Sequence, residues 1–342
     1  MKLFMPERAL FEPEALNYPL GRQLYERFSN EGVEIKKGSV QSIQSFIPGI
    51  GEKERYARSK KTVVVTTKKG LVFDVCKPSA DYEFSLVTNC PGHCEYCYLQ
   101  TTQGFKPFLR IYVNLEEIFE AVIKHIHKNG DNITTFEIAS SGDPLALEHL
   151  TGSVAKTIEF FGDLEKGRLR LVTKYNNVDS LCGLKHNGHT KFRVSLNAKY
   201  VIDSFEHNTS SFEERIEAAS KIASAGYPIG FIIAPIMIFE NWKKEYEQLF
   251  QKLYESLESV PLAQPATFEL IQHRFTKTAK NFILQRFPNT KLDMEEYNRE
   301  IKWGKFGRTK YVYPKEQATE LQNEISELIC KYFPDSAIEY FT

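Results

Sequence analysis

The chain has 342 residues, of which 42% are hydrophobic and 26% are charged, a composition typical of a globular protein with one large domain or two. Its 44 basic and 44 acidic residues give a formal net charge of zero, which excludes a global attraction to nucleic acid, so any such binding must come from local patches. No apolar stretch is long enough to span a membrane, and the segment Met1–Leu10 lacks the apolar run of a signal peptide. We therefore expect a cytoplasmic protein without a membrane partner.

Residues 1–80 predict a small α+β extension. A helix is expected near Gly21–Asn30. A β-hairpin is expected from the strands Thr62–Thr67 and Leu71–Val75, because the glycine of the connecting Lys-Lys-Gly sequence can supply the positive φ of a tight turn. Residues 53–69 are also strongly basic, and we assign no function to this patch.

From residue 84 to about residue 275, short β-rich runs alternate with amphipathic helical runs. The helix candidates are Leu115–Asn129, which follows the capping residue Asn114, and Ser211–Ala225. The expected strands are Phe84–Thr88, Thr134–Ala139, Leu169–Thr173, Phe192–Leu196, Ile229–Ala234 and Thr267–Ile271. Six strands in alternation with helices indicate an α/β fold, and this number suits a partial (β/α)6 barrel of the TIM type better than a flat, doubly wound sheet. Sites of such barrels gather at the carboxyl ends of the strands.

Residues 276–342 predict a C-terminal β-hairpin followed by a closing helix, Pro314–Phe333. The hairpin carries a run of basic and aromatic residues around two glycines: Lys302, Trp303, Lys305, Arg308, Lys310 and Tyr311. Basic groups can neutralise phosphates and aromatic rings can stack on bases, so this run is a candidate nucleic-acid contact; the alternative is a solvated, charged hairpin. We therefore divide the chain into three segments, residues 1–80, 81–275 and 276–342.

The cysteines Cys90, Cys94 and Cys97 have the spacing C-x3-C-x2-C and directly follow the first expected strand of the barrel. Such a set can hold three corners of a [4Fe-4S] cluster and leaves the fourth iron open, whereas a structural zinc and an electron-carrying cluster normally take four protein ligands. The alternatives are a zinc site completed by His93 or by a remote residue, and three unrelated thiols. An open iron is a place where an outside ligand can react.

The cysteine motif, with Tyr96 as its aromatic residue, resembles the C-x3-C-x-aromatic-C motif of the radical S-adenosylmethionine superfamily. The resemblance implies a [4Fe-4S] cluster and S-adenosylmethionine as cofactors, a 5′-deoxyadenosyl radical, and hydrogen abstraction from an unactivated carbon. It also implies a glycine-rich turn after the second strand that binds the methionine amine. The sequence Ser141-Gly142-Asp143-Pro144 is similar to that turn, although such a tetrapeptide can also be a turn that caps a helix through Asp143.

Further polar residues at the strand ends could complete the cofactor site. Lys174 follows the third strand and suits a carboxylate, while Ser195 and Asn197 at the fourth strand suit ribose hydroxyls. The backbone at Ala234 in the fifth strand could recognise adenine. The alternative for each residue is a strand end that meets solvent.

Over its full length the chain resembles the spore photoproduct lyase family, from Phe4-Met5-Pro6 through the cysteine loop to Trp303-Gly304-Lys305. The resemblance implies DNA repair, in which 5-thyminyl-5,6-dihydrothymine in ultraviolet-damaged double-stranded DNA is returned to two thymines after hydrogen abstraction at C6. It implies that the basic aromatic hairpin enters DNA and that a reductant such as flavodoxin or ferredoxin supplies the electron. A monomer in the spore core of a spore-forming bacterium is the corresponding expectation.

The chain departs from this family at a catalytic position. The family's hydrogen donor is a cysteine in the context Phe-Glu-x-Ala-Cys, whereas this chain has Ser140 there. A serine O–H bond is much stronger than a thiol S–H bond, so we expect Ser140 to be a poor donor and the final step to be impaired; Ser140 is either an engineered or a divergent feature. Tyr96 and Tyr98 match family tyrosines that relay the radical, and the alternative for both is packing around the cluster.

Two other classes of protein stay open. One is a radical enzyme that acts on RNA, a peptide or a small molecule, in which the C-terminal hairpin would be a lid or a protein contact. The other is a non-enzymatic iron–sulfur protein that binds nucleic acid. Such a protein should have a fourth cysteine ligand, and Cys76 is the only candidate within reach in the sequence.

Overall fold

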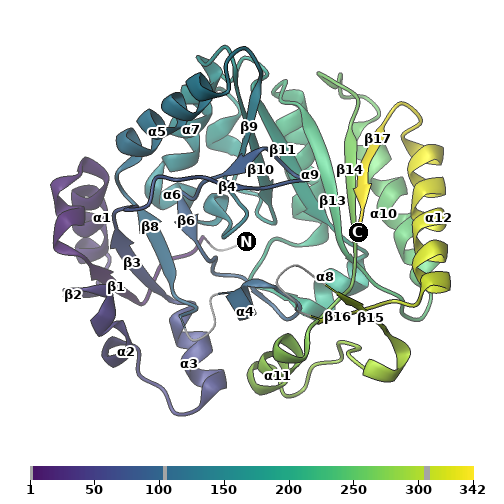
Figure 1. Ribbon diagram of the computed structural model, residues 1–342, viewed down its shortest axis with the longest axis horizontal. Helices are drawn as coiled ribbons and strands as arrows, with labels where there is room; N and C mark the ends of the chain where they lie inside the picture. The colour runs from purple at the N-terminus through teal and green to yellow at the C-terminus, as the bar shows by residue number, and fades with distance from the viewer. Residues whose placement is uncertain (1–2, 103–105, 304–308) are drawn as a thin grey trace.

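The chain forms a partial barrel with a second sheet fused to one side, in a computed structural model that describes residues 3–102, 106–303 and 309–342 (Figure 1). The eight strands of the barrel sheet are, in order, β17 (Ala337–Phe341), β14 (Thr267–Gln272), β13 (Ile229–Ile236), β11 (Thr190–Leu196), β10 (Gly167–Thr173), β9 (Thr134–Glu137), β5 (Tyr82–Glu83) and β4 (Asp74–Val75). All neighbours are parallel except β4 and β5. The predicted partial α/β barrel is confirmed.

The first strand of the barrel differs from the expectation. The prediction of Phe84–Thr88 as a barrel strand is wrong, because the strand that pairs with β9 is β5, which ends at Glu83. Within the predicted range, β6 (Val87–Thr88) pairs antiparallel with β8 (Leu109–Tyr112) in the other sheet. The terminal strand β17 was not predicted. It extends the barrel beyond β14, so the sheet begins and ends with strands from outside the predicted core segment.

The second sheet has the order β2 (Glu34–Lys37), β1 (Arg8–Phe11), β3 (Thr62–Thr66), β8 and β6. The hairpin predicted for residues 62–75 is wrong, because β3 pairs in parallel with β1 and β8 and not with β4. All five residues of β3 are buried. A run of β-branched residues without alternation is typical of a parallel strand that is covered on both faces.

The helices lie outside the sheets. Four predicted helices are confirmed as α1 (Pro19–Asn30), α5 (Leu115–Lys128), α9 (Phe212–Ser224) and α12 (Lys315–Tyr332). The others are α2 (Ile43–Phe46), α3 (Glu52–Ser59), α4 (Leu99–Thr102), α6 (Glu148–Thr151), α7 (Ser153–Gly162), α8 (Lys199–Phe205), α10 (Trp242–Leu257) and α11 (Lys277–Arg286). Short 3-10 helices span residues 13–17, 40–42, 144–147, 179–181 and 296–298. Within the described residues, no helix has the length and apolar composition that crossing a bilayer requires.

The cap of α5 differs from the expectation. Asn114 stands at the capping position, but its side chain makes no capping bond; it accepts from the backbone N–H of Lys68 at 2.7 Å and donates to Glu117 at 2.6 Å. Asn114 thereby ties the loop after β3 to the start of α5. Ser211, in contrast, forms a complete capping box with Glu214 at the start of α9.

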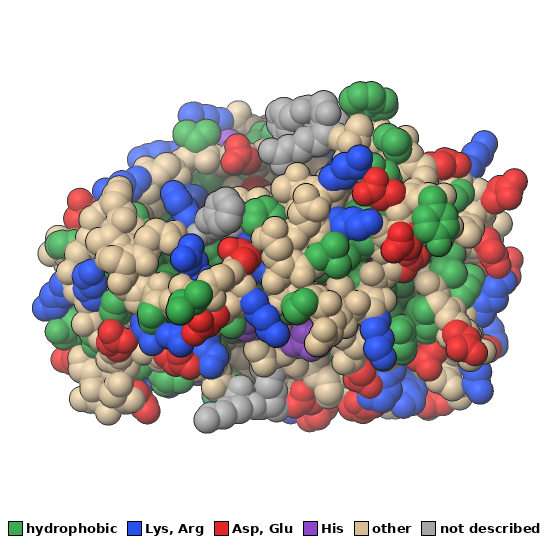
Figure 2. Space-filling model, turned by 90° about the horizontal axis from the view of Figure 1, so that it is seen from below, with side chains coloured by type: hydrophobic (Ala, Val, Ile, Leu, Met, Phe, Trp, Pro, Cys, Tyr) green, Lys and Arg blue, Asp and Glu red, His purple; other side chains and the backbone are tan. Residues whose placement is uncertain are grey.

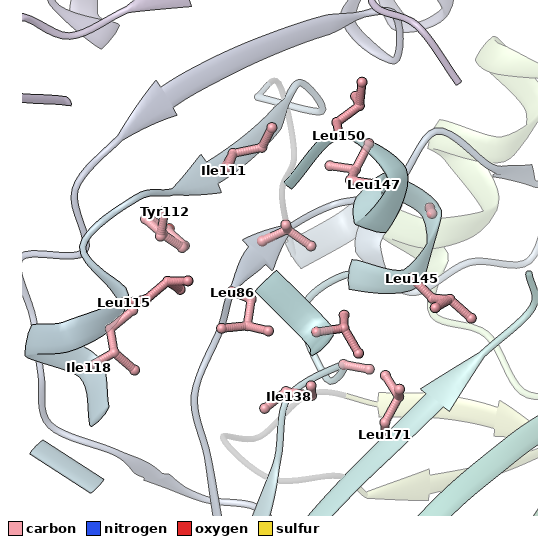
Figure 3. Close-up of a cluster of buried hydrophobic side chains, with 14 of the residues drawn as sticks. Leu86, Ile111, Tyr112, Leu115, Ile118, Ile138, Leu145, Leu147, Leu150 and Leu171 are labelled. Carbon is pink, nitrogen blue, oxygen red and sulfur yellow. The ribbon is translucent and has the colours of Figure 1, made fainter. Parts of the chain in front are cut away.

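One apolar core joins the two sheets. Leu86, which precedes β6, and Ile111 on β8 belong to the same cluster as Ile138, Leu147 and Leu171 from the barrel side, and all five are buried (Figure 3). The barrel sheet also contains strands from all three predicted segments, since β4 precedes residue 80 and β17 follows residue 275. The division into three segments therefore stays a prediction about organisation, and the segments do not form separate sheets.

Charged side chains connect strands through the inside of the barrel. Arg193 on β11 forms an ion pair with Glu137 on β9 and donates to Glu269 on β14 at 2.8 Å. Tyr340 on β17 donates to Glu269 at 2.5 Å and also meets Ser79, which follows β4, at 3.2 Å. Polar groups therefore link the two edges of the open sheet.

We predict that Arg193→Met strongly destabilises the fold. Arg193, Glu137 and Glu269 are each almost fully buried, and removal of the cation leaves two carboxylates without it, which costs about 3–5 kcal/mol. The free energy of unfolding in denaturant measures this loss.

The matched control for Arg193→Met is Lys185→Met. Lys185 pairs with Asp163 at 2.8 Å on the surface, and such exposed pairs contribute about 1 kcal/mol or less. Equal stability of the two variants would show that the buried network does not hold the barrel together.

Candidate active site at the cysteine loop

Cys90, Cys94 and Cys97 lie close together at the end of the barrel where the parallel strands finish. Burial raises the pKa of the Cys90 and Cys94 thiols, and the charge of Cys97 adds to both shifts. Asn89 opens the loop with a left-handed φ of 65°, a conformation that asparagine adopts more readily than most residues. The three thiols are therefore near enough to influence one another electrostatically.

Residues that are distant in the sequence contact the cysteine loop. The two-residue strand β7 (His93–Cys94) pairs antiparallel with the two-residue strand β12 (Glu206–His207). Lys60, which is 3% exposed, donates to the carbonyl of Cys90 at 2.7 Å and to the Asn89 side chain at 2.9 Å. Lys60 belongs to the basic patch of residues 53–69, and nothing in that run of charges distinguished this buried lysine from its neighbours.

The zinc site completed by His93, which the sequence left open, is not formed among the described residues. The Nδ1 atom of His93 meets the Asn208 amide at 2.8 Å, and its ring lies edge-on to Tyr56. Burial lowers the pKa of His93 to about 4. In the part of the chain that the structure describes, no three His, Cys, Asp or Glu side chains form a site for one metal ion. The iron–sulfur cluster at these cysteines stays a prediction from their spacing.

The turn after β9 packs directly against the cysteine loop. The Asn89 N–H donates to the carbonyl of Ser141 at 2.7 Å, and Asn89 forms a parallel bridge with Gly142. A side chain on Gly142 would place its Cβ 2.5 Å from the Asn89 carbonyl oxygen, so only glycine fits. The Ser141 hydroxyl meets that of Ser85 at 2.7 Å. The two sequence motifs, which begin at Cys90 and Ser141, therefore form one structural unit.

Asp143 connects this turn to the next strand. Its buried carboxylate accepts from the Thr173 hydroxyl and the Lys174 N–H, both at 2.9 Å, and burial raises the pKa of Asp143 to about 6. Asp143 also stands at the N-cap position of the 3-10 helix that follows, and its carboxylate interacts with the Leu145 N–H, so the capping alternative stays open. Asp143 sets the position of the chain at Lys174.

Lys174 and Tyr96 share one buried carboxylate. Lys174 donates to Glu206 at 2.9 Å and to the Tyr96 hydroxyl at 3.1 Å, and Tyr96 itself donates to Glu206. Arg215 donates to the second oxygen of Glu206 at 2.5 Å. Burial by itself would raise the pKa of Glu206, but Arg215 and Lys174 hold it down at about 2. Sequence reasoning missed Glu206 and Arg215, because only the folded chain brings them together.

The other predicted cofactor residues lie on the neighbouring strands. Ser195 on β11 is buried, and Ala234 on β13 is half-buried. Asn197 is fully buried, donates to the Pro235 carbonyl at 2.7 Å and accepts from Tyr246 at 2.9 Å. Asn197 therefore links the end of β11 to β13. Its contact with a cofactor stays a prediction.

Ser140 and Tyr98 differ in their surroundings. The Ser140 hydroxyl is buried and has no hydrogen-bond partner among the described residues. Tyr98 is 58% exposed. Burial of its hydroxyl and then the charges of Cys97, Glu83 and Cys76 raise the pKa of Tyr98.

The predicted C-terminal hairpin is present as β15 (Glu300–Trp303) and β16 (Thr309–Val312). Trp303 is 76% exposed and Lys302 pairs across the ribbon with Lys310. Lys305 and Arg308 lie outside the described residues. Figure 2 shows the molecule from below, with Lys and Arg side chains intermixed with Asp and Glu. The charge of this face alone therefore does not indicate a binding site on it.

Tyr311 does not have the exposed position that base stacking requires. Only 6% of it is exposed, its ring stacks on Phe275 at 5.2 Å, and the backbones of the two residues pair. The buried Arg299 packs over Tyr313 at 3.9 Å and donates to the His273 carbonyl at 3.2 Å. These contacts anchor the ribbon to the barrel, and they leave the Trp303 end exposed.

The model of the family described as spore photoproduct lyase matches residues 4–342. The chain belongs to the spore photoproduct lyase family. The spore photoproduct lyase of Geobacillus sp. (strain Y412MC61) is 50% identical over 100% of both chains, and that of Bacillus subtilis (strain 168) is 46% identical over 99% of both. The spore photoproduct lyase of Clostridium acetobutylicum is 43% identical over 98% of both chains.

Solved structures of spore photoproduct lyases share this fold. One is complexed with dinucleoside spore photoproduct and has a TM-score of 0.96 at 49% identity, with both chains covered completely. A second, also at TM-score 0.96 and 50% identity over both full chains, contains AdoMet and dinucleoside spore photoproduct. It is a double variant in which the cysteine at position 140 is replaced by alanine and the serine at position 76 by cysteine.

We predict that Gly142→Ala disrupts the cysteine loop. The new methyl group would overlap the Asn89 backbone, and such overpacking costs about 1–3 kcal/mol. After reconstitution with iron and sulfide, the iron content of each chain should fall. Gly183→Ala is the matched control, because an added Cβ there meets nothing within 4 Å. Equal iron content in both variants would contradict the prediction that the turn at Gly142 holds the cysteine loop in place.

We also predict that Glu206→Gln lowers stability at neutral pH by about 3 kcal/mol, because Arg215 and Lys174 lose their shared anion. The pKa of Glu206 is about 2 in the folded chain and 4.5 ordinarily, so its charge stabilises the fold fully above pH 4.5. That stabilisation is lost as the pH falls toward 2, and the difference between the two proteins should narrow over this range.

Denaturant titrations of both proteins across this pH range test the Glu206 prediction. Glu213→Gln is the control, since Glu213 is exposed and only pairs with Lys199 at 3.7 Å. A stability difference for Glu206→Gln that does not change with pH would assign the loss to packing.

Proposed function

We propose that this chain is a DNA repair enzyme, a radical S-adenosylmethionine lyase that returns the spore photoproduct, 5-thyminyl-5,6-dihydrothymine, to two thymines. The observation that carries the proposal is the contact between the cysteine loop and the turn at Gly142, at the carboxyl ends of the barrel strands. The full-length similarity to spore photoproduct lyases, including structures with dinucleoside spore photoproduct and with AdoMet, supports it.

The chain's own residues divide the work of holding the cofactors. Cys90, Cys94 and Cys97 would bind the [4Fe-4S] cluster. S-adenosylmethionine would bind to the surrounding strand ends, which carry Ser141, Gly142, Asp143, Lys174, Ser195, Asn197 and Ala234. When bound, these groups supply the 5′-deoxyadenosyl radical that removes hydrogen from C6 of the lesion. Glu206 and Asp143 fix Lys174 in place, so this ammonium group is positioned before a ligand arrives.

The hairpin of β15 and β16 would contact damaged double-stranded DNA. The lesion must leave the base stack to reach the inside of a barrel, so the duplex must be held open. Trp303 is exposed and can act as a wedge or a stacking surface, and Lys302 and Lys310 can meet phosphates. Lys305 and Arg308 are further candidates for such contacts. Tyr311 would instead anchor the hairpin through Phe275.

The three segments take different parts in this proposal. Residues 81–275 carry the radical chemistry, residues 276–342 carry the DNA contact, and residues 1–80 support the cysteine loop through Lys60. We further propose a monomer that receives its electron from flavodoxin or ferredoxin and acts in the cytoplasm, in the spore core.

Ser140 would not complete the reaction. After the bond between the two thymine units breaks, a carbon radical must regain a hydrogen atom, and the strong O–H bond of serine does not release one readily. Tyr96 and Tyr98 would relay the radical. A Ser140→Cys variant that gave no cleaner recovery of thymine would contradict this assignment for Ser140.

The competing function is a radical enzyme for RNA, a peptide or a small molecule. It predicts no preference for duplex DNA. To distinguish the two, the protein is reconstituted anaerobically, reduced with S-adenosylmethionine, and given duplex oligonucleotides with or without the thymine cross-link. We expect 5′-deoxyadenosine and lesion-derived products only with the cross-link. Cofactor cleavage that ignores the lesion would overturn the proposed substrate.

Two variants sharpen this experiment. Cys94→Ala should lose the cluster and all activity, whereas Cys330→Ala should change neither, because Cys330 is an exposed free thiol on α12. Trp303→Ala should weaken binding of the damaged duplex and leave the reaction of the dinucleoside lesion unchanged. A loss with both substrates would place Trp303 in the fold and not at the DNA.

A further inference from the structure

The second sheet reverses its winding direction at β1. Its strands β2, β1, β3 and β8 lie side by side in this order and are parallel (Figure 1). From β1 the chain passes through α1 to β2 on one side, and from β2 it passes through α2 and α3 to β3 on the other side of β1. In parallel sheets, connections that leave in opposite directions open a crevice beyond the carboxyl ends of the strands, and ligands bind there.

Helices cover opposite faces of this sheet, as a doubly wound arrangement requires. Phe11 and Val65 pack in one apolar cluster with residues of α1. Leu10 and Val64, which precede them in the sequence, pack in another cluster with residues of α2. Successive side chains of a strand point to opposite faces, so α1 and α2 lie on different sides of β1 and β3.

An open hollow of about 330 Å³ lies at this switch point. The residues that line it include Glu12, Thr66, Lys68, Lys69, Gly70 and Arg110. Glu12 directly follows β1, Thr66 ends β3, and residues 68–70 form the loop after β3. The hollow therefore lies where the topology predicts a ligand. Its volume is at the lower end of the roughly 300–1,000 Å³ that small-molecule sites occupy.

Positive charge predominates around the hollow. Among the described residues that line it are three cations, Lys68, Lys69 and Arg110, and one carboxylate, Glu12. The Lys69 ammonium also meets Glu14, which lies outside the lining, at 3.5 Å, and both side chains are more than half exposed. Such an exposed pair is weak. The lining therefore favours an anion.

The single carboxylate of the lining holds the walls of the hollow together. One oxygen of Glu12 accepts from the Val40 N–H at 3.0 Å, and the other accepts from the Thr66 hydroxyl. These bonds join the end of β1 to the segment after β2 and to the end of β3. Both oxygens of Glu12 are thus engaged with the protein at the switch point.

Arg110 is fixed by two neighbours on the second sheet. Its guanidinium packs over the ring of Phe108 at 4.4 Å and donates to the Thr88 hydroxyl at 3.3 Å. Burial lowers the pKa of Arg110, but a guanidinium keeps its charge at neutral pH. A partly desolvated, planar cation with several donors suits a phosphate group, which it can bind through two parallel hydrogen bonds.

The loop that carries Lys68 is ordered before a ligand arrives. The Lys68 N–H donates to the Asn114 side chain at 2.7 Å, and the Asn114 amide donates back to the Lys68 carbonyl at 3.1 Å. The Lys68 ammonium lies over the Tyr112 ring at 5.2 Å. A site with its charges already in place loses less conformational freedom on binding.

We propose that this hollow binds a phosphorylated small molecule of mononucleotide size, with Arg110 and Lys68 at its phosphate group and Lys69 at the rim. The site is separate from the cysteine loop. Lys60, just before β3, contacts that loop, whereas the hollow lies at the other end of β3, and a strand of five residues spans about 17 Å. The inference therefore does not depend on the proposed lyase function.

Calorimetric titration of the reconstituted protein tests this proposal. The probes are inorganic phosphate, the four ribonucleoside 5′-monophosphates and the corresponding nucleosides without phosphate. We expect at least one monophosphate to bind more tightly than inorganic phosphate, and its nucleoside not to bind. Absence of binding for phosphate and for all four monophosphates at millimolar concentration would overturn the proposal.

Two pairs of variants locate the binding. Lys68→Met should weaken the monophosphate by about tenfold or more, because it removes a hydrogen bond to a charged group. Lys61→Met is the matched control, since Lys61 lies at the other end of β3 and pairs with Glu7 at 2.7 Å. Gly70→Glu should weaken binding to a similar extent by placing a carboxylate at the rim, whereas Gly70→Ala should not, because a Cβ there meets nothing within 4 Å. Equal affinity within either pair would contradict the assigned site.

Two competitions separate this site from the other ligands of the protein. Excess S-adenosylmethionine should not displace the monophosphate, and displacement would place the monophosphate in the cofactor site and overturn the proposal. Undamaged duplex DNA that binds more weakly to Lys68→Met, together with no binding of the small probes, would make the hollow a nucleic-acid contact and also overturn it. As a second readout, the monophosphate should raise the free energy of unfolding of wild type and Gly70→Ala but not of Gly70→Glu.

Discussion

The close approach of Asn89 to Gly142 is the contact on which the candidate site depends. It joins the start of the cysteine loop to the end of β9 through one backbone hydrogen bond of 2.7 Å and leaves no room for a side chain. A short loop such as residues 89–98 has little internal structure of its own, so its cysteines need support from the rest of the fold. The barrel strand supplies that frame, and Lys60 and β12 hold the opposite side.

Two groups of buried charged side chains lie inside the barrel, and they have different roles. Arg193, Glu137 and Glu269 join strands across the sheet, and Tyr340 with Ser79 extends this connection to both edges. Nearer the cysteine loop, Glu206 forms ion pairs with both Lys174 and Arg215. Buried charges of this kind contribute little net stability compared with apolar packing, but removal of one member is costly. Their value lies in fixing the positions of side chains around an open lumen.

Strands could be predicted from the sequence where a short apolar run by itself indicated one. The apolar runs that became β9, β10, β11, β13 and β14 stood out between helices, and the cysteine spacing indicated a cluster. The hairpin at residues 62–75 failed because two strands that are adjacent in sequence found their partners elsewhere, and only the tertiary fold decides such pairing. Lys60, Glu206 and Arg215 looked like ordinary surface charges, since no sequence pattern reveals that they become buried partners. Tyr311 was misjudged for the same reason, because Phe275 lies 36 residues away.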